Sequence, residues 1–214
     1  SGVGRWAEAL PPTEQAVEIR RRLAADNPTA HEPHLASSLS NLGVRLSEVG
    51  RWAEALKATE QAVEIRRRLA ADNPAAHEPY FATSLSNLGA FLSEVGRWAE
   101  ALKATEQAVE IRRRLAADNP TAHEPDLATS LSVWASVRLR GQHDLSGALQ
   151  ATSEAVEIYR RLISVRPHDL HFLSPLRAVL SLQVRVLLGL GRLQDAQTIR
   201  DWLEVNPGQP DSQN

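Results

Sequence analysis

Residues 50–74 read GRWAEALKATEQAVEIRRRLAADNP, and residues 96–120 repeat this segment letter for letter. Residues 4–28 form a third copy, which differs only in Pro11 and Pro12. Successive copies begin 46 residues apart. A fixed period of about 20–50 residues is typical of solenoids, in which every repeat buries its apolar face against its neighbours. The sequence therefore predicts a continuous array whose function lies on a surface.

Each repeat predicts a pair of helices, which we call helix A and helix B. Ahead of the quoted segment, apolar residues at steps of three and four lie on one face of helix A: Leu35, Leu39, Leu42, Leu46 and Val49. Gly50 ends helix A, and a second helical stripe begins at Trp52 and forms helix B. Because the residue before a proline avoids helical geometry, Pro74 and Pro79 predict a loop over residues 70–79.

The same pattern divides the chain into one array over residues 1–206 and a short tail. Pro11 and Pro12 predict that the first helix B begins near Pro12, without a helix A before it. The predicted elements are this unpaired helix at 12–25, helix pairs at 35–71, 81–117, 127–165 and 174–205, and a flexible tail at 207–214.

The repeat combines large and small residues in a recognisable order: Leu39, Leu42, Gly43, Leu46, Gly50, Trp52, Ala55 and Ala62. This order resembles the tetratricopeptide repeat family, and the resemblance implies an all-α, right-handed superhelix of antiparallel helix pairs. Gly43 and Ala55 match the family's two small positions, where the helices cross closely. The family's usual period is about 34 residues. The extra length, expected in helix B and the following loop, is similar to the kinesin light chain subfamily.

Composition excludes several classes of function. A net charge of -2 argues against a general nucleic-acid binder, because such proteins carry a strong basic surplus. The chain has no cysteine and no catalytic or phosphate-binding motif. No apolar run approaches the roughly 18 residues of a membrane span. We therefore expect a non-enzymatic, cytoplasmic protein that uses no cofactor and binds neither nucleic acid nor membrane.

Residue usage also indicates an origin. Lys57 and Lys103 are the only lysines, whereas arginine and alanine are abundant, which is typical of bacterial coding sequences of high GC content. The sequence has no methionine and opens Ser-Gly inside a repeat. We therefore expect an excised part of a larger regulatory or sensor protein.

The family resemblance implies that a second face of helix A lines a concave groove for partner peptides. Asn41 and Asn87 match the position at which similar proteins hold a peptide backbone, since an amide both donates and accepts hydrogen bonds. The other candidates on this face are mostly small: Ser37, Ser40, Val44, Thr83, Ser86, Ala90, Thr129 and Ser132. The alternative is that the asparagines support packing or face water. No lysine stands at these positions, so a clamp for a terminal carboxylate is not expected.

Other features have competing interpretations. Helix B ends in arginine runs at 20–22, 66–68, 112–114 and 160–161, which could bind phosphate or RNA. We favour structural or solvated roles, because cations complement a helix C-terminus and pair with glutamates one turn away. Histidines recur before Glu-Pro and in two short-spaced pairs, at His31, His34, His77, His123, His168 and His171. No further ligands accompany them, so no metal site is predicted.

Two further predictions concern packing. The unpaired first helix B would leave bare an apolar stripe that includes Ala16, Val17 and Leu23, and such stripes are docking sites. Self-association as a homodimer through this helix is therefore the alternative to peptide binding. Trp52 and Trp98 are expected in the seams between repeats.

Overall fold

The computed structural model describes residues 2–165 and 170–206. The chain divides into two compact units, Ser1–Ile111 and Arg112–Asn214. The described residues contain helices, turns and no strand, as predicted. The α-helices in chain order are α1 Gly2–Asp26, α2 Pro28–Glu48, α3 Trp52–Asp72, α4 Pro74–Glu94, α5 Trp98–Asp118, α6 Pro120–Arg140, α7 Leu145–Val165, α8 Leu173–Gly189 and α9 Leu193–Val205. A 3-10 turn, η1 at Leu170–Phe172, precedes α8.

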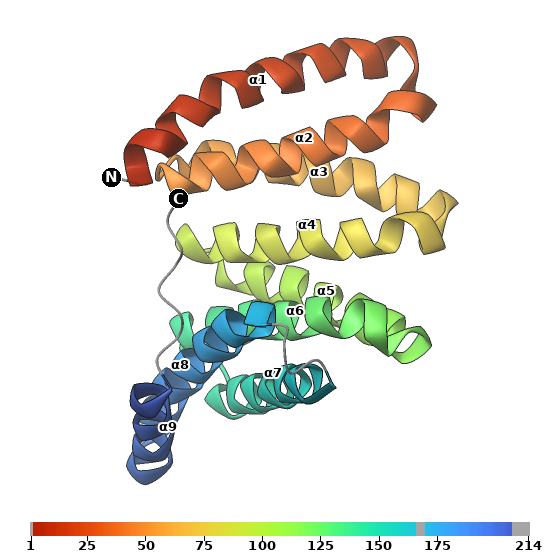
Figure 1. Ribbon diagram of the computed structural model, residues 1–214. Coiled ribbons are helices and arrows are strands. Elements are labelled where there is room, and N and C mark those ends of the chain that lie inside the picture. Colours follow the sequence, from red (N-terminus) through yellow and green to blue (C-terminus); the bar gives the residue numbers. More distant parts are fainter. Residues whose placement is uncertain (1, 166–169, 207–214) are drawn as a thin grey trace. The chain divides into compact units, whose positions relative to one another are not determined.

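Unit 1 stacks consecutive antiparallel helices from α1 to the greater part of α5 (Figure 1). In this unit α2 and α4 are helix A, and α1, α3 and α5 are helix B. Its core consists of small and branched side chains with occasional phenylalanine: Leu39, Ala55, Ala62, Val63, Phe81 and Leu85. The packing therefore follows the apolar stripes of the sequence.

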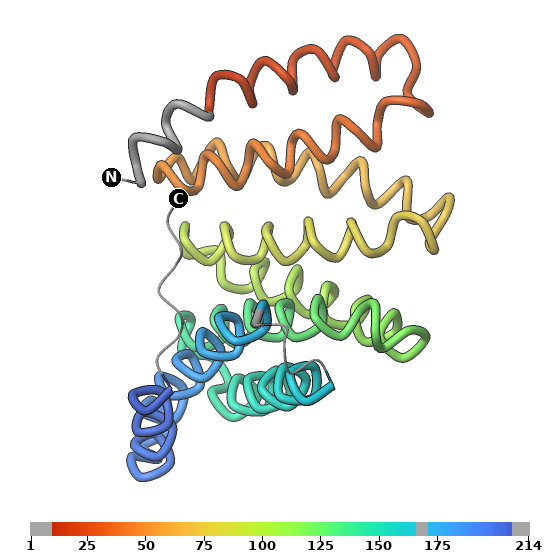
Figure 2. Tube along the Cα trace, viewed as in Figure 1, coloured from red at the N-terminus to blue at the C-terminus, as the bar shows by residue number. Residues whose placement is uncertain are grey.

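Unit 2 contains the end of α5 and the helices α6 to α9. The tube view shows α8 and α9 as the last antiparallel hairpin (Figure 2). The core of this unit is again aliphatic: Leu131, Val137, Ala155, Val156, Val186 and Leu187. None of the described helices is both long and apolar enough to span a membrane. The predicted tail at 207–214 lies outside the described residues.

The connection from helix B to helix A is a single residue, so the loop predicted over 70–79 is wrong. The Asn73 backbone N–H donates to the Leu69 carbonyl at 2.9 Å, and its side-chain oxygen accepts from the N–H of Ala76 at 3.3 Å. Pro74 then occupies the start of α4, where the helix does not use an amide hydrogen. The helix also continues through Pro79. The restriction on a residue before proline is a preference, and α4 overrides it there.

The same junction recurs at Asn27 and Asn119. Helix A therefore begins earlier than predicted, at Pro28, Pro74 and Pro120 and not at residues 35, 81 and 127. In the repeats that begin at Pro28 and Pro74, both helices are 21 residues long. The extra length of the repeat thus lies in both helices, and not in helix B and a loop. The last pair, α8 and α9, lies close to the predicted 174–205.

The first helix also begins earlier than predicted. α1 starts at Gly2 and contains Pro11 and Pro12 in its interior, whereas we expected a helix at 12–25. A proline removes an amide hydrogen, but its fixed φ is close to that of an α-helix. Two consecutive prolines therefore remove two backbone hydrogen bonds without forcing the chain out of helical geometry.

Glycine is required at the turn from helix A to helix B. Gly50 has φ of 76°, and its counterparts Gly96 and Gly191 have φ of 76° and 72°. A side chain in this left-handed region clashes with the following carbonyl, so only glycine adopts it readily. This confirms that Gly50 is the stop between the two helices.

Gly43 serves a different purpose, because it lies where α2 crosses α3. A Cβ added there would overlap Thr59 Oγ1 and would stand 3.2 Å from the Ala55 carbonyl oxygen. The small residues of the repeat therefore allow the close helix crossing that the sequence predicted.

Candidate functional site

The predicted groove residues of unit 1 lie on two neighbouring helices, α2 and α4. The hydroxyls of Ser40 on α2 and Ser84 on α4 share a hydrogen bond of 3.1 Å, so the two helices touch at this level. Asn41 follows Ser40 and is exposed, and Asn87 is half-buried. Within the described chain, neither asparagine side chain makes a hydrogen bond. The two amides are thus available to a ligand.

Most of the hydroxyl candidates have contacts inside the fold. Two are buried, with 7 % of the residue exposed: Ser40 and Ser86. Four donate to a carbonyl one turn earlier in their own helix: Ser37, Thr83, Thr129 and Ser132. Val44 and Ala90 are half-buried one turn after the two asparagines. The candidate face of unit 1 is therefore narrower than the sequence suggested.

Thr129 and Ser132 belong to α6 in unit 2, where the amide is missing. Val133 stands in α6 at the position that Asn41 and Asn87 hold in the other repeats. The structure thus restricts the pair of amides to unit 1. We define the asparagine face as Asn41, Val44, Asn87 and Ala90.

The arginine runs are more ordered than their composition suggests. Only the first arginine of a run is buried, with 7 % of Arg66 and 3 % of Arg112 exposed. Arg66 Nη1 donates to the Tyr80 carbonyl at 3.0 Å and to Ser84 Oγ at 2.6 Å, both on α4. Arg112 pairs with the Asp126 carboxylate on α6 at 2.8 Å. The first arginine therefore ties helix B to the helix A that follows it.

Burial lowers the pKa of Arg66 to about 10, which leaves the guanidinium charged at neutral pH. Burial likewise lowers the pKa of Arg112. In α7 the equivalent residue is Tyr159, whose hydroxyl shares a hydrogen bond of 3.1 Å with Thr129 Oγ1. Burial raises the pKa of this hydroxyl, so it stays protonated. The position is a buried polar tie in both units.

The second and third arginines of a run reach other helices across the surface. Arg68 pairs with Glu32 on the preceding helix A at 2.7 Å, and Arg161 pairs with Glu124 in the same way at 2.7 Å. Arg113 reaches Glu154 on the next helix B at 2.6 Å. Because these guanidinium groups already have protein partners, the structure favours the structural interpretation over a phosphate-binding ridge.

Aromatic residues and histidines take the roles that the sequence suggested for them in unit 1. The rings of Trp52 and Phe91 lie 6.1 Å apart, which places Trp52 in the seam with the next helix A. His31 and His77 are half-buried beside the helix junctions. The described residues contain no group of three or more metal-ligating side chains, and His168 lies outside them.

The outer face of α1 exposes apolar side chains that other repeats bury. Ile19 is 51 % exposed, whereas the equivalent Ile65 and Ile111 are 9 % and 7 % exposed. Leu23 is also exposed, as predicted. Val17, which we expected on this bare stripe, is buried, and Ala16 is half-buried. Their side of α1 packs inside unit 1, so the bare stripe is centred on Ile19 and Leu23.

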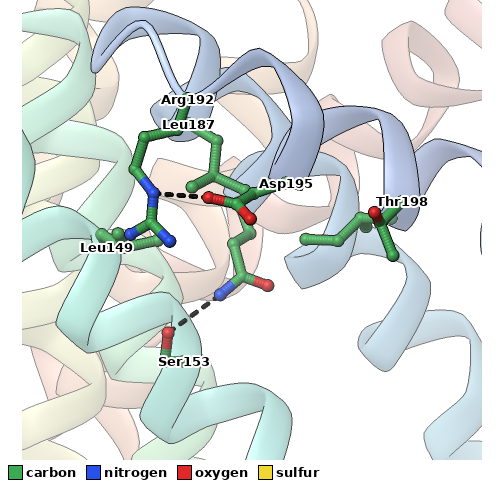
Figure 3. Close-up of a pocket in the computed structure, with 8 residues that line it drawn as sticks. Leu149, Ser153, Leu187, Arg192, Asp195 and Thr198 are labelled. Atoms are coloured by element: carbon green, nitrogen blue, oxygen red, sulfur yellow. Dashed lines mark hydrogen bonds and ion pairs between the residues drawn. The ribbon is translucent and has the colours of Figure 1, made fainter.

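The sequence analysis missed a pocket between α7, α8 and α9 in unit 2. It has a volume of about 320 Å³, and Ser153, Gln183 and Arg192 are among its lining residues. Figure 3 shows the Arg192 side chain joined to Asp195, with Leu149 beside the guanidinium group and Ser153 further along α7. The available signal was Ser153 itself, which replaces a glutamate of the earlier repeats.

The antiparallel helix pairs, turn glycines and helix-crossing glycines define a helical-repeat protein of the solenoid class. A family model described as the tetratricopeptide repeat matches residues 35–75 and 81–121. The repeats of this chain belong to the tetratricopeptide repeat family. Such repeats generally serve as scaffolds for protein–protein interaction. A search of curated proteins finds no significant match to the chain.

Solved structures share the fold at low sequence identity. BtubC (BKLC) from P. vanneervenii is 17 % identical, with a TM-score of 0.60, and the match covers 100 % of this chain and 97 % of that one. A point variant of the kinesin-light-chain, nearly identical TPR-like repeats of Podosopora anserina is 22 % identical with a TM-score of 0.61. That match covers 94 % of this chain and 86 % of the other. These neighbours confirm the kinesin-light-chain-like repeat type, while bacterial origin stays a prediction.

Proposed function

We propose that the chain is a non-enzymatic interaction scaffold that binds a peptide segment of a partner protein on the asparagine face. One observation carries the proposal: two amides on adjacent copies of helix A have no partner among the described residues. Most of the nearby hydroxyl groups, by contrast, are committed to the fold. The larger regulatory or sensor protein and the cytoplasmic location expected from the sequence belong to this proposal.

The spacing of the amides suits an extended peptide. Packed helices lie about 8–10 Å apart, and three extended residues span about 10 Å. Asn41 and Asn87 would therefore hold peptide units about three residues apart. Each amide pairs with the backbone and leaves the partner's side chains to contact Val44 and Ala90. Affinity then depends on a short, regularly spaced stretch of backbone.

The test is a peptide-library binding screen with the parent chain and the double variant Asn41→Ala, Asn87→Ala. Each net hydrogen bond contributes about 0.5–1.5 kcal/mol. Loss of one such bond at each site should weaken binding about 5- to 150-fold. Circular dichroism and melting must first show that the double variant is folded like the parent.

A matched control removes two amides from helix B. Gln15 and Gln107 are exposed and occupy equivalent positions in α1 and α5. The variant Gln15→Ala, Gln107→Ala should bind peptides like the parent. Equal binding by the parent and the asparagine variant, or no peptide bound by either, would mean that the asparagines are scaffold residues and would overturn the proposal.

A second candidate function is self-association through α1, which the exposure of Ile19 supports. The identical residue is covered in α3 and α5, so α1 presents a surface shaped to receive another helix. We propose a second copy of this chain as the occupant, with the two α1 helices packed in an isologous contact.

Light scattering over a concentration series tests this candidate. The parent should form a dimer that Ile19→Glu with Leu23→Glu abolishes. The control Ile199→Glu, on α9, should leave the dimer intact. A parent that stays monomeric at the highest concentration would rule out self-association.

A further inference from the structure

The residue just before helix B is an arginine that holds two carboxylates in unit 1. Arg51 contacts Glu54 of its own helix at 2.6 Å and Glu14 of the preceding helix B at 3.5 Å. Arg97 repeats both contacts, with Glu100 at 2.6 Å and with Glu60 at 3.4 Å. The fold thus provides one arginine with a local carboxylate and a second one from the neighbouring helix.

In unit 2 the second carboxylate is missing. Arg192 precedes α9 and binds Asp195 of its own helix at 2.6 Å, as Arg51 binds Glu54. Alignment of the copies places Ser153 of α7 where α1 has Glu14 and α3 has Glu60. Among the described residues, Arg192 has no other acidic partner. A serine is too short to replace the glutamate.

The space left by the shorter side chain is the pocket of about 320 Å³ between α7, α8 and α9 (Figure 3). Ser153 Oγ accepts a hydrogen bond from Gln183 Nε2 at 2.9 Å, so its own hydroxyl hydrogen is free to donate. Gln183 is 9 % exposed, so this polar pair is buried at the pocket wall. The remaining wall is apolar, with Leu149, Leu187 and Ile199.

We propose that this pocket binds an external carboxylate on an apolar stem, in the place that Glu14 and Glu60 fill in unit 1. The carboxylate receives charge-assisted hydrogen bonds from Arg192 and a hydrogen bond from Ser153. The stem lies against Leu149, Leu187 and Ile199. Asp195 does not prevent this, because Arg51 and Arg97 each hold a local and a second carboxylate together.

The pocket is larger than a carboxylate group and is of the size that small-molecule sites have. The same chemistry is offered by a free short-chain acid and by an acidic side chain of a bound protein. The inference does not depend on the asparagine face, which lies in the other unit. Its failure would leave peptide binding on α2 and α4 untouched.

The experiment is an NMR titration that follows the Arg192 Nε–H and the Gln183 side-chain amide. One arm adds acetate, propionate or butyrate, with chloride at equal ionic strength as the reference. The other arm adds a blocked Leu-Glu dipeptide and its Leu-Gln counterpart. We expect saturable shifts, with affinity rising up to about fourfold for each added methylene of the free acid.

Two variants separate the pocket from general charge effects. Ser153→Glu restores the internal carboxylate, so it should abolish binding of either probe and raise the melting temperature. Arg192→Gln should also abolish binding. The control Gln150→Glu adds the same charge at an exposed residue of α7 that does not line the pocket, and it should bind like the parent.

Saturation by the free acids identifies a small-molecule site, and saturation by the Leu-Glu dipeptide alone identifies an acidic partner segment. Either result supports the proposal. Shifts that grow linearly for both probes, or that persist unchanged in Ser153→Glu, would overturn it.

Discussion

Arg66 and Arg67 are neighbours in the sequence, and their side chains lie in opposite environments. The Arg66 guanidinium is buried and donates to the Tyr80 carbonyl and to Ser84. Arg67 is exposed and pairs with Glu64 one turn earlier on its own helix at 2.7 Å. The difference arises because successive residues of a helix point about 100° apart, so a run of three arginines faces three different neighbours.

Substitution of these two arginines should therefore have unequal effects. Arg66→Ala removes a buried donor and leaves the Ser84 hydroxyl and the Tyr80 carbonyl short of a partner. Each such loss costs about 1–3 kcal/mol. Arg67→Ala removes an exposed ion pair, which contributes about 0.2–1 kcal/mol. Urea midpoints should fall clearly for Arg66→Ala and little for Arg67→Ala, and equal midpoints would contradict the assigned role.

Gly43 offers a second prediction at the residue scale. Gly43→Ala would press a methyl group against Thr59 Oγ1, and overpacking of this kind costs about 1–3 kcal/mol. Thr59 Oγ1 is buried without a hydrogen-bond partner, so Thr59→Ala alone should cost little. The double variant should recover most of the loss. Urea midpoints for the four proteins of this double-mutant cycle measure the coupling, and additive effects would argue against a steric cause.

At the scale of elements, the junction between α3 and α4 depends on one side chain. Asn73 Oδ1 accepts from the Ala76 N–H, and no other residue separates the two helices. Asn73→Ala should lower stability by about 1 kcal/mol, a typical cost for loss of a cap, whereas Asn73→Asp should keep the cap and most of the stability. Thermal melts of both variants are the measurement. Equal melting of the two would contradict the capping role.

Much of this arrangement could be predicted from the sequence, because period and apolar spacing report directly on helix packing. Helix B was placed correctly in α3 and α5, and Gly50 correctly marked the turn before it. The start of helix A was missed, because Pro74 and Pro79 were interpreted only as helix breakers. Near the first turn of a helix, proline is compatible with the structure, and an asparagine before it is a cap.

The candidate site was less predictable, because the function of a polar side chain depends on neighbours from other helices. Ser40 and Asn41 are adjacent in the sequence, and only the structure shows that Ser40 is buried against Ser84 while Asn41 is exposed. The pocket at Ser153 could have been found by comparing the copies at the position of Glu60. Its apolar walls come from three helices, and their convergence requires the fold.

At the scale of the whole chain, the near-identity of the repeats makes them exchangeable. α3 and α5 have the same sequence, so α6 would follow the same helix B whether it came after α3 or after α5. Removal of residues 74–119 joins Asn73 to Pro120 and rebuilds the Asn-Pro junction without a foreign residue. In a repeat protein, stability is close to a sum over repeats and their interfaces. The shortened chain should therefore fold with unchanged helicity per residue and a lower melting temperature.

The matched control is removal of residues 74–95, which deletes α4 and its turn and joins Asn73 to Gly96. This places two copies of helix B in succession, with no helix A to cover the apolar faces between them. The control chain should lose helicity per residue and melt with low cooperativity, as followed by circular dichroism. If both deletions behaved alike, register would not matter and the copies would not be interchangeable units. A difference between them would instead show that stability resides in the alternation of helix A with helix B, since the control removes fewer residues than the complete repeat.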